Sequence, residues 1–502
     1  MDEDDRYWDL NANDAEYEPP RRSRLRGCVF LVVTLVVVLS LAGSSLAAWF
    51  VVTHRDAVEA SARQAAGLAS ATEAPRLPTA APATLVASVP TPAPTVSLAP
   101  TPDGPVVNRI AIVNADGQVE TLAPGGGERR ILTRGGDETF FQFPTWSPDG
   151  RRLAVIGSTL TGGGIYVLPD ETSSATLDER AIYFSSNETP FYLYWSPDSE
   201  RLAFLANQSR NTMGLKIIAG DGASDSKLLA TGTPFYWDWA DDGRQLLVHS
   251  GQLRRGDLAL IDIEGETQAG NLATPGAFQA PGIASGGRYW AFAEEAEAGL
   301  SALVVVDTQT GERRSYEQAG SLALSWSPTR EQIAFTNGDA EGHPGWGTLH
   351  LLDVSTGQSR LLSRQRVLAF FWSPDGRAIA FVTISDDEDN GVVAQAPARR
   401  PTTARLASPA QQAQGMLSLS VVDVDTGQGL RLLDFEPTAT YIAQFLPFFD
   451  QYALSHRIWS PDSDALVLPV RQESGNVVLI VPTRGGRPQY LADGDIAFWS
   501  QR

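Results

Sequence analysis

The chain has 502 residues, of which 43% are hydrophobic and 9% aromatic, enough to bury a large core and to exclude wholesale disorder. Its 39 basic and 59 acidic residues give a formal net charge of −20, so no nucleic-acid partner is expected. The single cysteine, Cys28, excludes an intrachain disulfide framework and any site built from several thiolates. The two lysines, Lys216 and Lys227, lack the glycine-rich context of a P-loop.

The N-terminal region combines an acidic start with a long apolar run. Residues 1–27 begin with acidic and polar residues without apolar periodicity, which predicts a disordered cytoplasmic tail. The 25 residues of 28–52 carry no charge, against the roughly 20 needed to span a bilayer, and predict one transmembrane helix. The positive-inside rule places the N-terminus in the cytoplasm because four arginines precede this run: Arg21, Arg22, Arg24 and Arg26.

The protein is therefore expected in the plasma (inner) membrane, with a single-pass signal anchor and most of the chain outside the cytoplasm. The small residues Ser45, Ala47 and Ala48 leave cleavage as a signal peptide open as the alternative. Residues 53–105 are rich in alanine and proline, with nine prolines in the 31 residues from Pro75 to Pro105. This composition favours extended polyproline II geometry, at about 3.1 Å per residue, and predicts a stalk.

A motif centred on Trp-Ser-Pro-Asp-Gly recurs through the rest of the chain. Six copies are recognisable, and a degenerate copy from Ile283 lies between the third and the fourth. The tryptophans or their equivalents are 40 to 49 residues apart except at one insertion, which is the period of a four-stranded propeller blade. The structural positions of the repeat are Trp146, Asp149, Trp195, Asp198, Trp239, Asp242, Trp326, Trp372, Asp375, Trp459, Asp462 and Trp499.

Each part of the motif has a local physical reason. Proline presets the first central φ of a tight turn, aspartate can accept from backbone amides, and glycine tolerates the exit geometry. The β-prone, alternating runs that follow predict strands joined by hairpins. A tryptophan at the same point of most repeats is expected to pack between neighbouring sheets. Because the aspartates recur at one structural position, they are expected to serve turns rather than acid–base chemistry.

These residues resemble the TolB-type WSPDG β-propeller repeat, a WD40-like family, over residues 106–502. The resemblance implies an all-β propeller of four-stranded blades and a bacterial cell envelope. The first strands after residue 106 look like strands two to four of a blade, and the C-terminal IAFWSQR looks like a first strand, so the two ends are expected to close the ring. This count gives eight blades, or seven if the Ile283 copy is incomplete. The separate N-terminal domain of TolB is missing here, which argues against a TolB-like role.

No catalytic or cofactor-binding residue is predicted. The GxSxG nucleophile elbow of prolyl-oligopeptidase-like enzymes is missing, and the five histidines show no HxxxH or HExxH spacing. Residues 384–416 interrupt a blade between its second and third strands and are expected to be a flexible insertion. Its Asp386, Asp387 and Asp389 could hold calcium, although a solvated acidic loop is favoured because the spacing matches no EF-hand.

An over-long connection between two repeats, residues 436–459, gathers aromatic side chains. One interpretation is a cap over a mouth of the propeller channel, and the other is an exposed patch that binds a partner or ligand. The partner-binding candidates are Tyr441, Phe445, Phe448, Phe449 and Tyr452.

The sequence as a whole predicts a non-catalytic binding or scaffolding module. Its partner is expected to be a protein, peptide or glycan outside the cytoplasm. The alternatives are an enzyme or small-molecule sensor with its site at the channel mouth, and a surface structural protein that self-associates.

Overall fold

The computed structural model describes residues 107–134, 139–170, 181–208, 212–251, 256–270, 272–276, 279–297, 300–338, 345–385 and 416–501. All of these belong to one compact unit, Pro94–Arg502. The predicted tail, membrane helix and stalk (1–27, 28–52 and 53–105) lie outside the described residues, as does most of the 384–416 insertion. In the described ranges no helix combines the length and the hydrophobicity that a membrane span requires.

Antiparallel sheets account for most of the described chain, as the repeat predicts. Four sheets have four strands that follow one another in chain order. The first two contain β4 (Phe140–Trp146), β5 (Arg152–Ser158), β6 (Gly163–Pro169) and β7 (Ala181–Ser185), then β8 (Pro190–Trp195), β9 (Arg201–Asn207), β10 (Met213–Ala219) and β11 (Lys227–Gly232). The next two contain β12 (Phe235–Trp239), β13 (Gln245–Ser250), β14 (Asp257–Asp262) and β15 (Thr267–Ala269), then β16 (Gly282–Ile283), β17 (Tyr289–Glu295), β18 (Ser301–Asp307) and β19 (Arg313–Ala319). The degenerate Ile283 copy therefore does begin a four-stranded sheet.

The next two repeats share one seven-stranded sheet. Its 15-residue strand β23 pairs with β22 at its beginning and with β24 at its end. The sheet runs through β20 (Leu324–Trp326), β21 (Gln332–Asn337), β22 (Gly347–Asp353), β23 (Gln358–Trp372), β24 (Ala378–Ile384), β25 (Leu417–Asp423) and β26 (Gly429–Phe435). The insertion does separate the second and third strands of its repeat, since β24 pairs directly with β25.

The last repeat differs from the prediction at its first strand. Its sheet has three strands, β27 (Ala465–Gln472), β28 (Gly475–Pro482) and β29 (Gln489–Asp493). The strand expected around Trp459 is reduced to an isolated bridge between Trp459 and Leu466. The physical reason is competition for backbone partners, because the preceding helix ends only at Ser455 and Arg457 already bridges to Trp499.

The two ends of the unit close the ring as predicted. Strand β30 (Ile496–Trp499) pairs with β1 (Ile110–Val113), in the register Ile110↔Trp499 to Val113↔Ile496. The closing sheet is completed by β2 (Val119–Leu122) and β3 (Arg130–Ile131). The Trp499 indole also donates to the Asn108 side chain at 2.6 Å. Closure by both ends leaves fewer unpaired inner strand edges.

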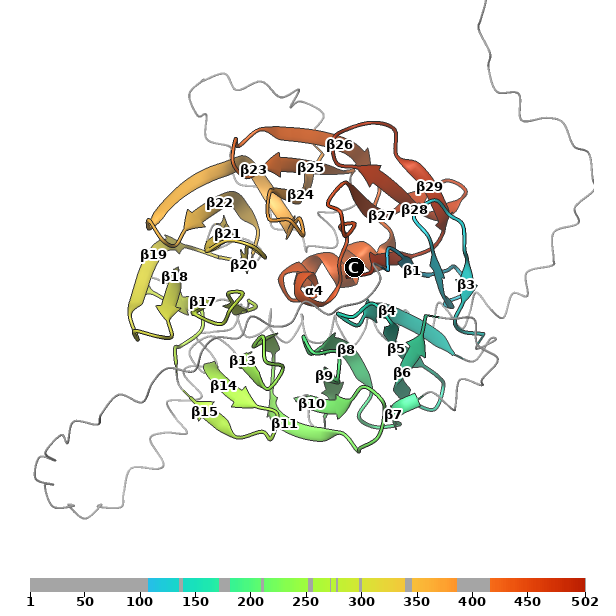
Figure 1. Ribbon diagram of the computed structural model, residues 1–502, viewed down its shortest axis with the longest axis horizontal. Coiled ribbons are helices and arrows are strands. Elements are labelled where there is room, and N and C mark those ends of the chain that lie inside the picture. The colour runs from blue at the N-terminus through green and yellow to red at the C-terminus, as the bar shows by residue number, and fades with distance from the viewer. Residues whose placement is uncertain are drawn as a thin grey trace, which may run out of the picture. The chain divides into compact units, whose positions relative to one another are not determined.

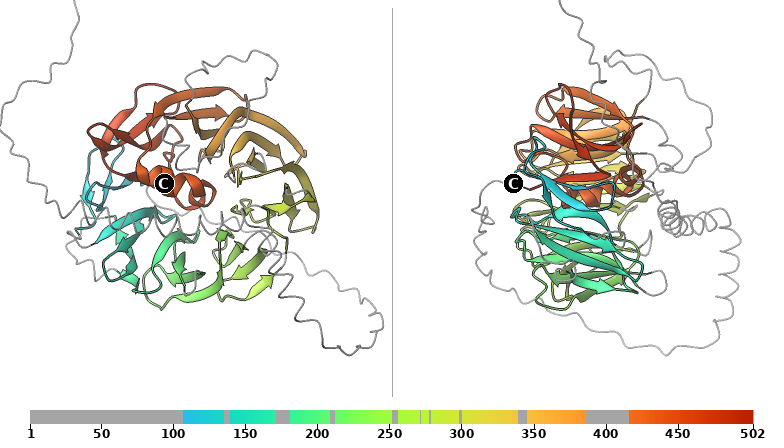
Figure 2. Two further views of the ribbon diagram at one scale, coloured as in Figure 1. Left: turned by 180° about the vertical axis from the view of Figure 1, so that it is seen from behind. Right: turned by 90° about the vertical axis from the view of Figure 1, so that its right-hand side faces the viewer.

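The sheets follow one another around a central axis, with their first strands innermost, and this arrangement is a β-propeller (Figures 1 and 2). Apolar residues fill the spaces between neighbouring sheets. The motif tryptophans connect each repeat to the one before it: their indole N–H groups donate to a backbone carbonyl of the preceding repeat at 3.0–3.4 Å. The pairs are Trp146–Phe498, Trp195–Thr145, Trp239–Tyr194, Trp326–Gly282, Trp372–Ser325 and Trp459–Phe371.

The motif aspartates lie in the turns between first and second strands. In each turn the carboxylate accepts from the backbone N–H two residues later: Asp149, Asp198, Asp242, Asp375 and Asp462. Ser199 and Ser463 replace the usual glycine at positive φ, 63° and 64°. Their hydroxyls accept from the amides of Asp149 and Asp375 in a neighbouring turn, which offsets the strain of a side chain in this conformation.

Candidate functional site

The aromatic connection 436–459 lies at the centre of the ring (Figure 1). It forms a π-helical turn η3 (Tyr441–Phe445), a 3₁₀ turn η4 (Leu446–Phe448) and helix α4 (Phe449–Ser455). We call these three elements the hub. A seven-residue helix is too short to be stable alone, so contacts with the surrounding sheets must hold it in place.

Aromatic stacking joins the hub to the inner strands. The Phe445 ring lies 5.7 Å from that of Phe371 and 5.5 Å from that of Phe498, measured between ring centroids. Tyr452 stacks on Phe143 at 4.9 Å and meets the edge of Tyr192 at 5.1 Å. The hub therefore touches strands from the closing sheet, from β4 and β8, and from the seven-stranded sheet.

Polar contacts join the hub to further strands. The Gln451 side chain holds the backbone of Trp237, accepting from its N–H at 2.8 Å and donating to its C=O at 2.9 Å. The Asp450 carboxylate accepts from the backbone N–H of Ala280 at 2.8 Å. The Tyr192 hydroxyl donates to the backbone carbonyl of Gln451 at 3.0 Å. These bonds satisfy buried polar groups that water cannot reach.

Four of the five aromatic partner-binding candidates are buried in these contacts. Tyr441, Phe445, Phe449 and Tyr452 face the ring interior, whereas Phe448 is 38% exposed. In this structure the connection therefore packs into the centre of the ring, and Phe448 is its exposed aromatic side chain. The sequence could not distinguish the two arrangements, because both require the same aromatic composition.

A serine and a histidine meet where the hub ends, Ser455 as its last residue and His456 directly after it. The Ser455 hydroxyl lies 2.6 Å from Nδ1 of His456, and the Tyr192 hydroxyl lies 2.8 Å from the same Ser455 oxygen. Ser455 and His456 are each 2% exposed. Burial lowers the pKa of His456 to about 3, so its imidazole is neutral at physiological pH. The pair therefore lies in the packed interior, closed off from solvent.

Two buried carboxylates, Asp450 in the hub and Asp238 in β12, have raised pKa values. Burial raises the pKa of Asp238 to about 7, although the N–H groups of Ile283 and Trp239 donate to it at 2.9 Å. Burial likewise raises the pKa of Asp450 to about 6, against its bond from Ala280. Asp238 bridges neighbouring inner strands, because Ile283 belongs to β16 and Asp238 to β12.

Asp238 is expected to make stability fall as pH rises. Its folded pKa of about 7 exceeds its ordinary value of 3.8, so the folded state binds the extra proton. This stabilisation is complete below pH 3.8 and is lost as pH rises through 7, by at most about 1.4 kcal/mol per pH unit. The depressed pKa of His456 has the opposite effect, because acid stability is lost as pH falls below its ordinary 6.5.

His249 has a depressed pKa as well, and the opposing effect of both histidines fades as pH rises above their ordinary value of 6.5. Urea unfolding from pH 6.5 to about pH 8 should show a free energy of unfolding that falls more steeply with pH in the native chain than in Asp238→Asn, because the other titrating groups are common to both. The exposed Asp221→Asn is the matched control and should keep the native slope. Parallel curves for the native chain and Asp238→Asn would contradict this assignment.

A second feature is a pocket of about 580 Å³ between the closing sheet and the β4–β7 sheet. We call it the seam pocket, and its lining includes Val107, Arg109, Glu128, Arg130, Arg151 and Asp170. Arg109 precedes β1, Arg130 begins β3, and Asp170 follows β6 of the adjacent sheet. The pocket thus lies across the junction where the ring is closed.

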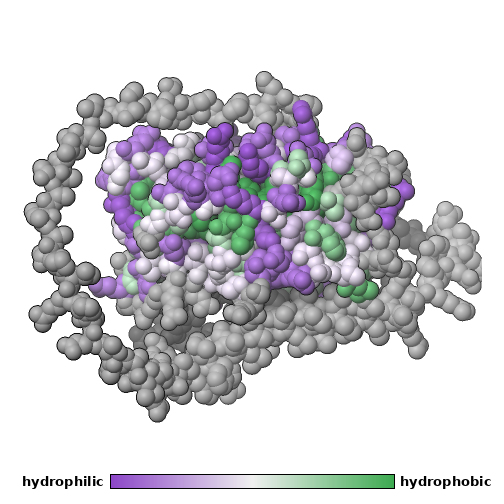
Figure 3. Space-filling view, turned by 90° about the horizontal axis from the view of Figure 1, so that it is seen from below, coloured by the Kyte–Doolittle hydropathy of each residue, from purple (hydrophilic) through white to green (hydrophobic). Residues whose placement is uncertain are grey.

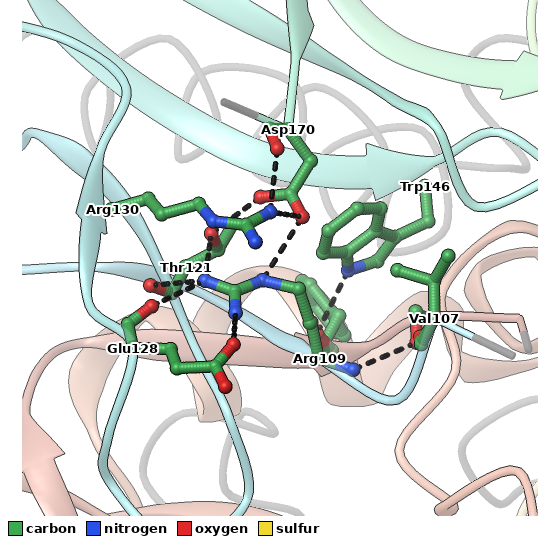
Figure 4. A network of polar contacts seen from close by, with 9 residues as sticks. Val107, Arg109, Thr121, Glu128, Arg130, Trp146 and Asp170 are labelled. Carbon is green, nitrogen blue, oxygen red and sulfur yellow. Dashed lines mark hydrogen bonds and ion pairs between the residues drawn. The ribbon is translucent and has the colours of Figure 1, made fainter. Parts of the chain in front are cut away.

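An ionic network lines the seam pocket (Figure 4). The guanidinium groups of Arg109 and Arg130 both point toward Asp170, with nitrogen–oxygen distances of 2.9 and 2.6 Å to the same carboxylate oxygen. The Thr121 hydroxyl donates to the other oxygen at 2.6 Å. Arg109 further donates to the backbone carbonyls of Thr121 and Glu128. Burial is the main cause that lowers the pKa of Arg109, and the neighbouring Arg130 contributes.

Sequence reasoning missed this network. The strands next to Arg109 and Asp170 are recognisable from the sequence, but no motif marks either residue as functional. Their contact depends on which sheet lies beside the closing sheet, and single-residue patterns do not carry that information. The structure adds no candidate metal site. Within the described ranges, no three His, Cys, Asp or Glu side chains cluster in a way that could hold a metal ion. Asp386, Asp387 and Asp389 lie outside those ranges, so calcium stays a prediction.

The chain is similar to several proteins of known structure. No protein-family model and no curated protein matches the chain. A putative TolB from Agrobacterium tumefaciens is 18% identical, over 52% of this chain and 91% of that one, with a TM-score of 0.33. The β-propeller domain of the Trilobed protease from Pyrococcus furiosus is 12% identical, over 72% and 97%, with a TM-score of 0.42. A dihydro-heme d1 dehydrogenase is 11% identical, over 81% and 78%, with a TM-score of 0.48. At these identities the similarity concerns the fold, and not the activity of any of these proteins.

Proposed function

We propose that this protein is a membrane-anchored binding or scaffolding module whose β-propeller recognises a protein, peptide or glycan outside the cytoplasm. Residues 28–52 are its anchor and 53–105 its stalk. The propeller has eight blades if the seven-stranded sheet is divided at β23 and the three-stranded sheet is one blade. In this function the ring positions a partner and carries out no reaction itself.

The observation that carries this proposal is the filled centre of the ring. The polar hub groups described above are bonded to the surrounding strands, for example Gln451 to Trp237 and Asp450 to Ala280. A site at a channel mouth would instead keep some of these groups open to a substrate. The hub also ties several inner strands together, and a rigid surface loses little conformational entropy when it binds.

The outer rim is the favoured binding surface. Of the large hydrophobic residues that are exposed in the described ranges, six lie on outermost strands: Ile131, Phe184, Leu228, Leu361, Leu430 and Tyr490. Figure 3 shows one side of the ring, where hydrophobic patches alternate with hydrophilic ones. Exposed apolar residues of this kind mark candidate contact surfaces.

A cysteine-based cross-linking experiment tests both location and binding. Cys28 is the only cysteine, so Cys28→Ser provides a background for single introduced cysteines. In that background, Phe184→Cys on the rim should react with a membrane-impermeant, thiol-linked photo-cross-linker in intact cells or spheroplasts. Illumination should then give one adduct of defined mass.

Two matched variants make the result interpretable. Asn11→Cys, in the predicted cytoplasmic tail, should react only after permeabilisation. Arg244→Cys, in an exposed turn between first and second strands, should react but give no adduct. Absence of reaction at Phe184→Cys would contradict the location, and reaction without any adduct would contradict binding at the rim.

A further inference from the structure

The seam pocket holds more positive than negative charge at close range. Asp170 is the buried carboxylate of the network, and its oxygen Oδ2 is shared by Arg109 and Arg130. The second carboxylate, Glu128, lies 3.4 Å from Arg109, but its side chain is 74% exposed. Water screens such an exposed charge, so Glu128 compensates the arginines weakly.

A third arginine lines the same pocket. Arg151 is exposed, and it makes no ion pair with any residue that the structure describes. The half-buried Arg130 directs one of its two terminal nitrogens, Nη1, to Asp170. Both side chains therefore have donors left for a ligand, whereas Arg109 is engaged by Thr121, Glu128 and Asp170.

We propose that the seam pocket binds a small polyanion that carries carboxylate or phosphate groups, with Arg130 and Arg151 as its contact residues. Guanidinium groups bind both kinds of anion through paired N–H donors, and such charge-assisted bonds are stronger than neutral ones. A pocket of about 580 Å³ is within the size range of small-molecule sites. This site adjoins one part of the rim surface, since Arg130 precedes the rim residue Ile131 in β3, but it takes a different kind of ligand.

Binding there is expected to reinforce ring closure. Arg130 belongs to β3 of the closing sheet, while Arg151 lies in the turn before β5 of the neighbouring sheet. An anion held by both side chains would connect the two sheets at the junction of the chain ends. A ligand that binds only the folded ring stabilises it, and its melting temperature keeps rising as the ligand concentration exceeds the Kd.

The chain offers a matched control for Arg151. Arg244 occupies the same position after an Asp-Gly turn, in the β12–β15 sheet, and it is exposed but does not line the pocket. Each of the two substitutions, Arg151→Ala and Arg244→Ala, removes one exposed positive charge. Non-specific attraction of the anion to the protein surface would change equally in both variants. Only binding at the seam pocket would make their affinities differ.

The experiment is calorimetric titration of the purified full-length chain with citrate and, separately, with inorganic phosphate at constant ionic strength. We expect saturable binding of at least one anion, weakened roughly tenfold in Arg151→Ala and unchanged in Arg244→Ala. The anion that binds with the lower Kd shows whether the pocket prefers carboxylate or phosphate groups. Equal weakening in both variants, or no saturation with either anion, would overturn the proposal.

Discussion

Phe445→Ala is expected to lower the free energy of unfolding by about 3–5 kcal/mol, the usual cost of truncating a fully buried phenylalanine. Phe445 is 0% exposed, and its ring centroid lies within 5.7 Å of those of Phe371, Tyr441, Tyr452 and Phe498. Removing it leaves a cavity at the point where the hub meets the closing sheet and the seven-stranded sheet. Urea unfolding followed by tryptophan fluorescence measures the loss.

The control for this prediction lies three residues away. Phe448 belongs to the same hub but is 38% exposed, so Phe448→Ala should cost less than about 1 kcal/mol. A small effect at both positions would show that the hub is not required for ring stability. A loss of cross-linking in Phe448→Ala with unchanged stability would instead identify the exposed side of the hub as a contact surface.

Asp170→Ala is expected to have the second large effect, about 3–5 kcal/mol, because it leaves buried positive charge without its partner. The Asp170 side chain is 6% exposed and pairs with Arg109, which is equally buried, and with Arg130. Replacing Arg109 by methionine in the same chain should recover part of the loss, because an apolar group then replaces the unpaired cation.

An exposed ion pair provides the comparison. Asp425 pairs with Arg330 across two nitrogen–oxygen contacts, but the two side chains are 62% and 33% exposed. Asp425→Ala should therefore cost at most about 1 kcal/mol, and this cost should shrink in high salt. If Asp170→Ala costs no more than Asp425→Ala, the seam network is not shielded from water as its burial indicates.

The two effects concern different parts of ring closure. The hub connects inner strands at the centre, whereas Asp170 and Arg109 connect the closing sheet to its neighbour at the seam. These sites have no partner in common, so the losses in Phe445→Ala and Asp170→Ala should be nearly additive in the double variant. A marked deviation from additivity would reveal coupling through the closing sheet.

The sequence by itself determined the repeating architecture. The period of the Trp-Ser-Pro-Asp-Gly motif, the turn role of residues such as Asp149, and the packing of Trp195 against the preceding sheet all follow from local patterns. Turn chemistry and strand alternation depend on residues close in the chain, which is why they can be read from it. The pairing of the chain ends followed from counting strands in the incomplete first and last repeats.

Only the tertiary structure decided how the centre and the seam are built. The aromatic composition of 436–459 was visible, but the burial of Phe445 and the exposure of Phe448 depend on strands from several distant repeats. The raised pKa of Asp238 and the meeting of Arg109 with Asp170 likewise arise where separate sheets converge. How deeply a side chain is buried, and which charge it pairs with, depends on contacts between segments that are far apart in the sequence. A single segment therefore does not reveal these properties.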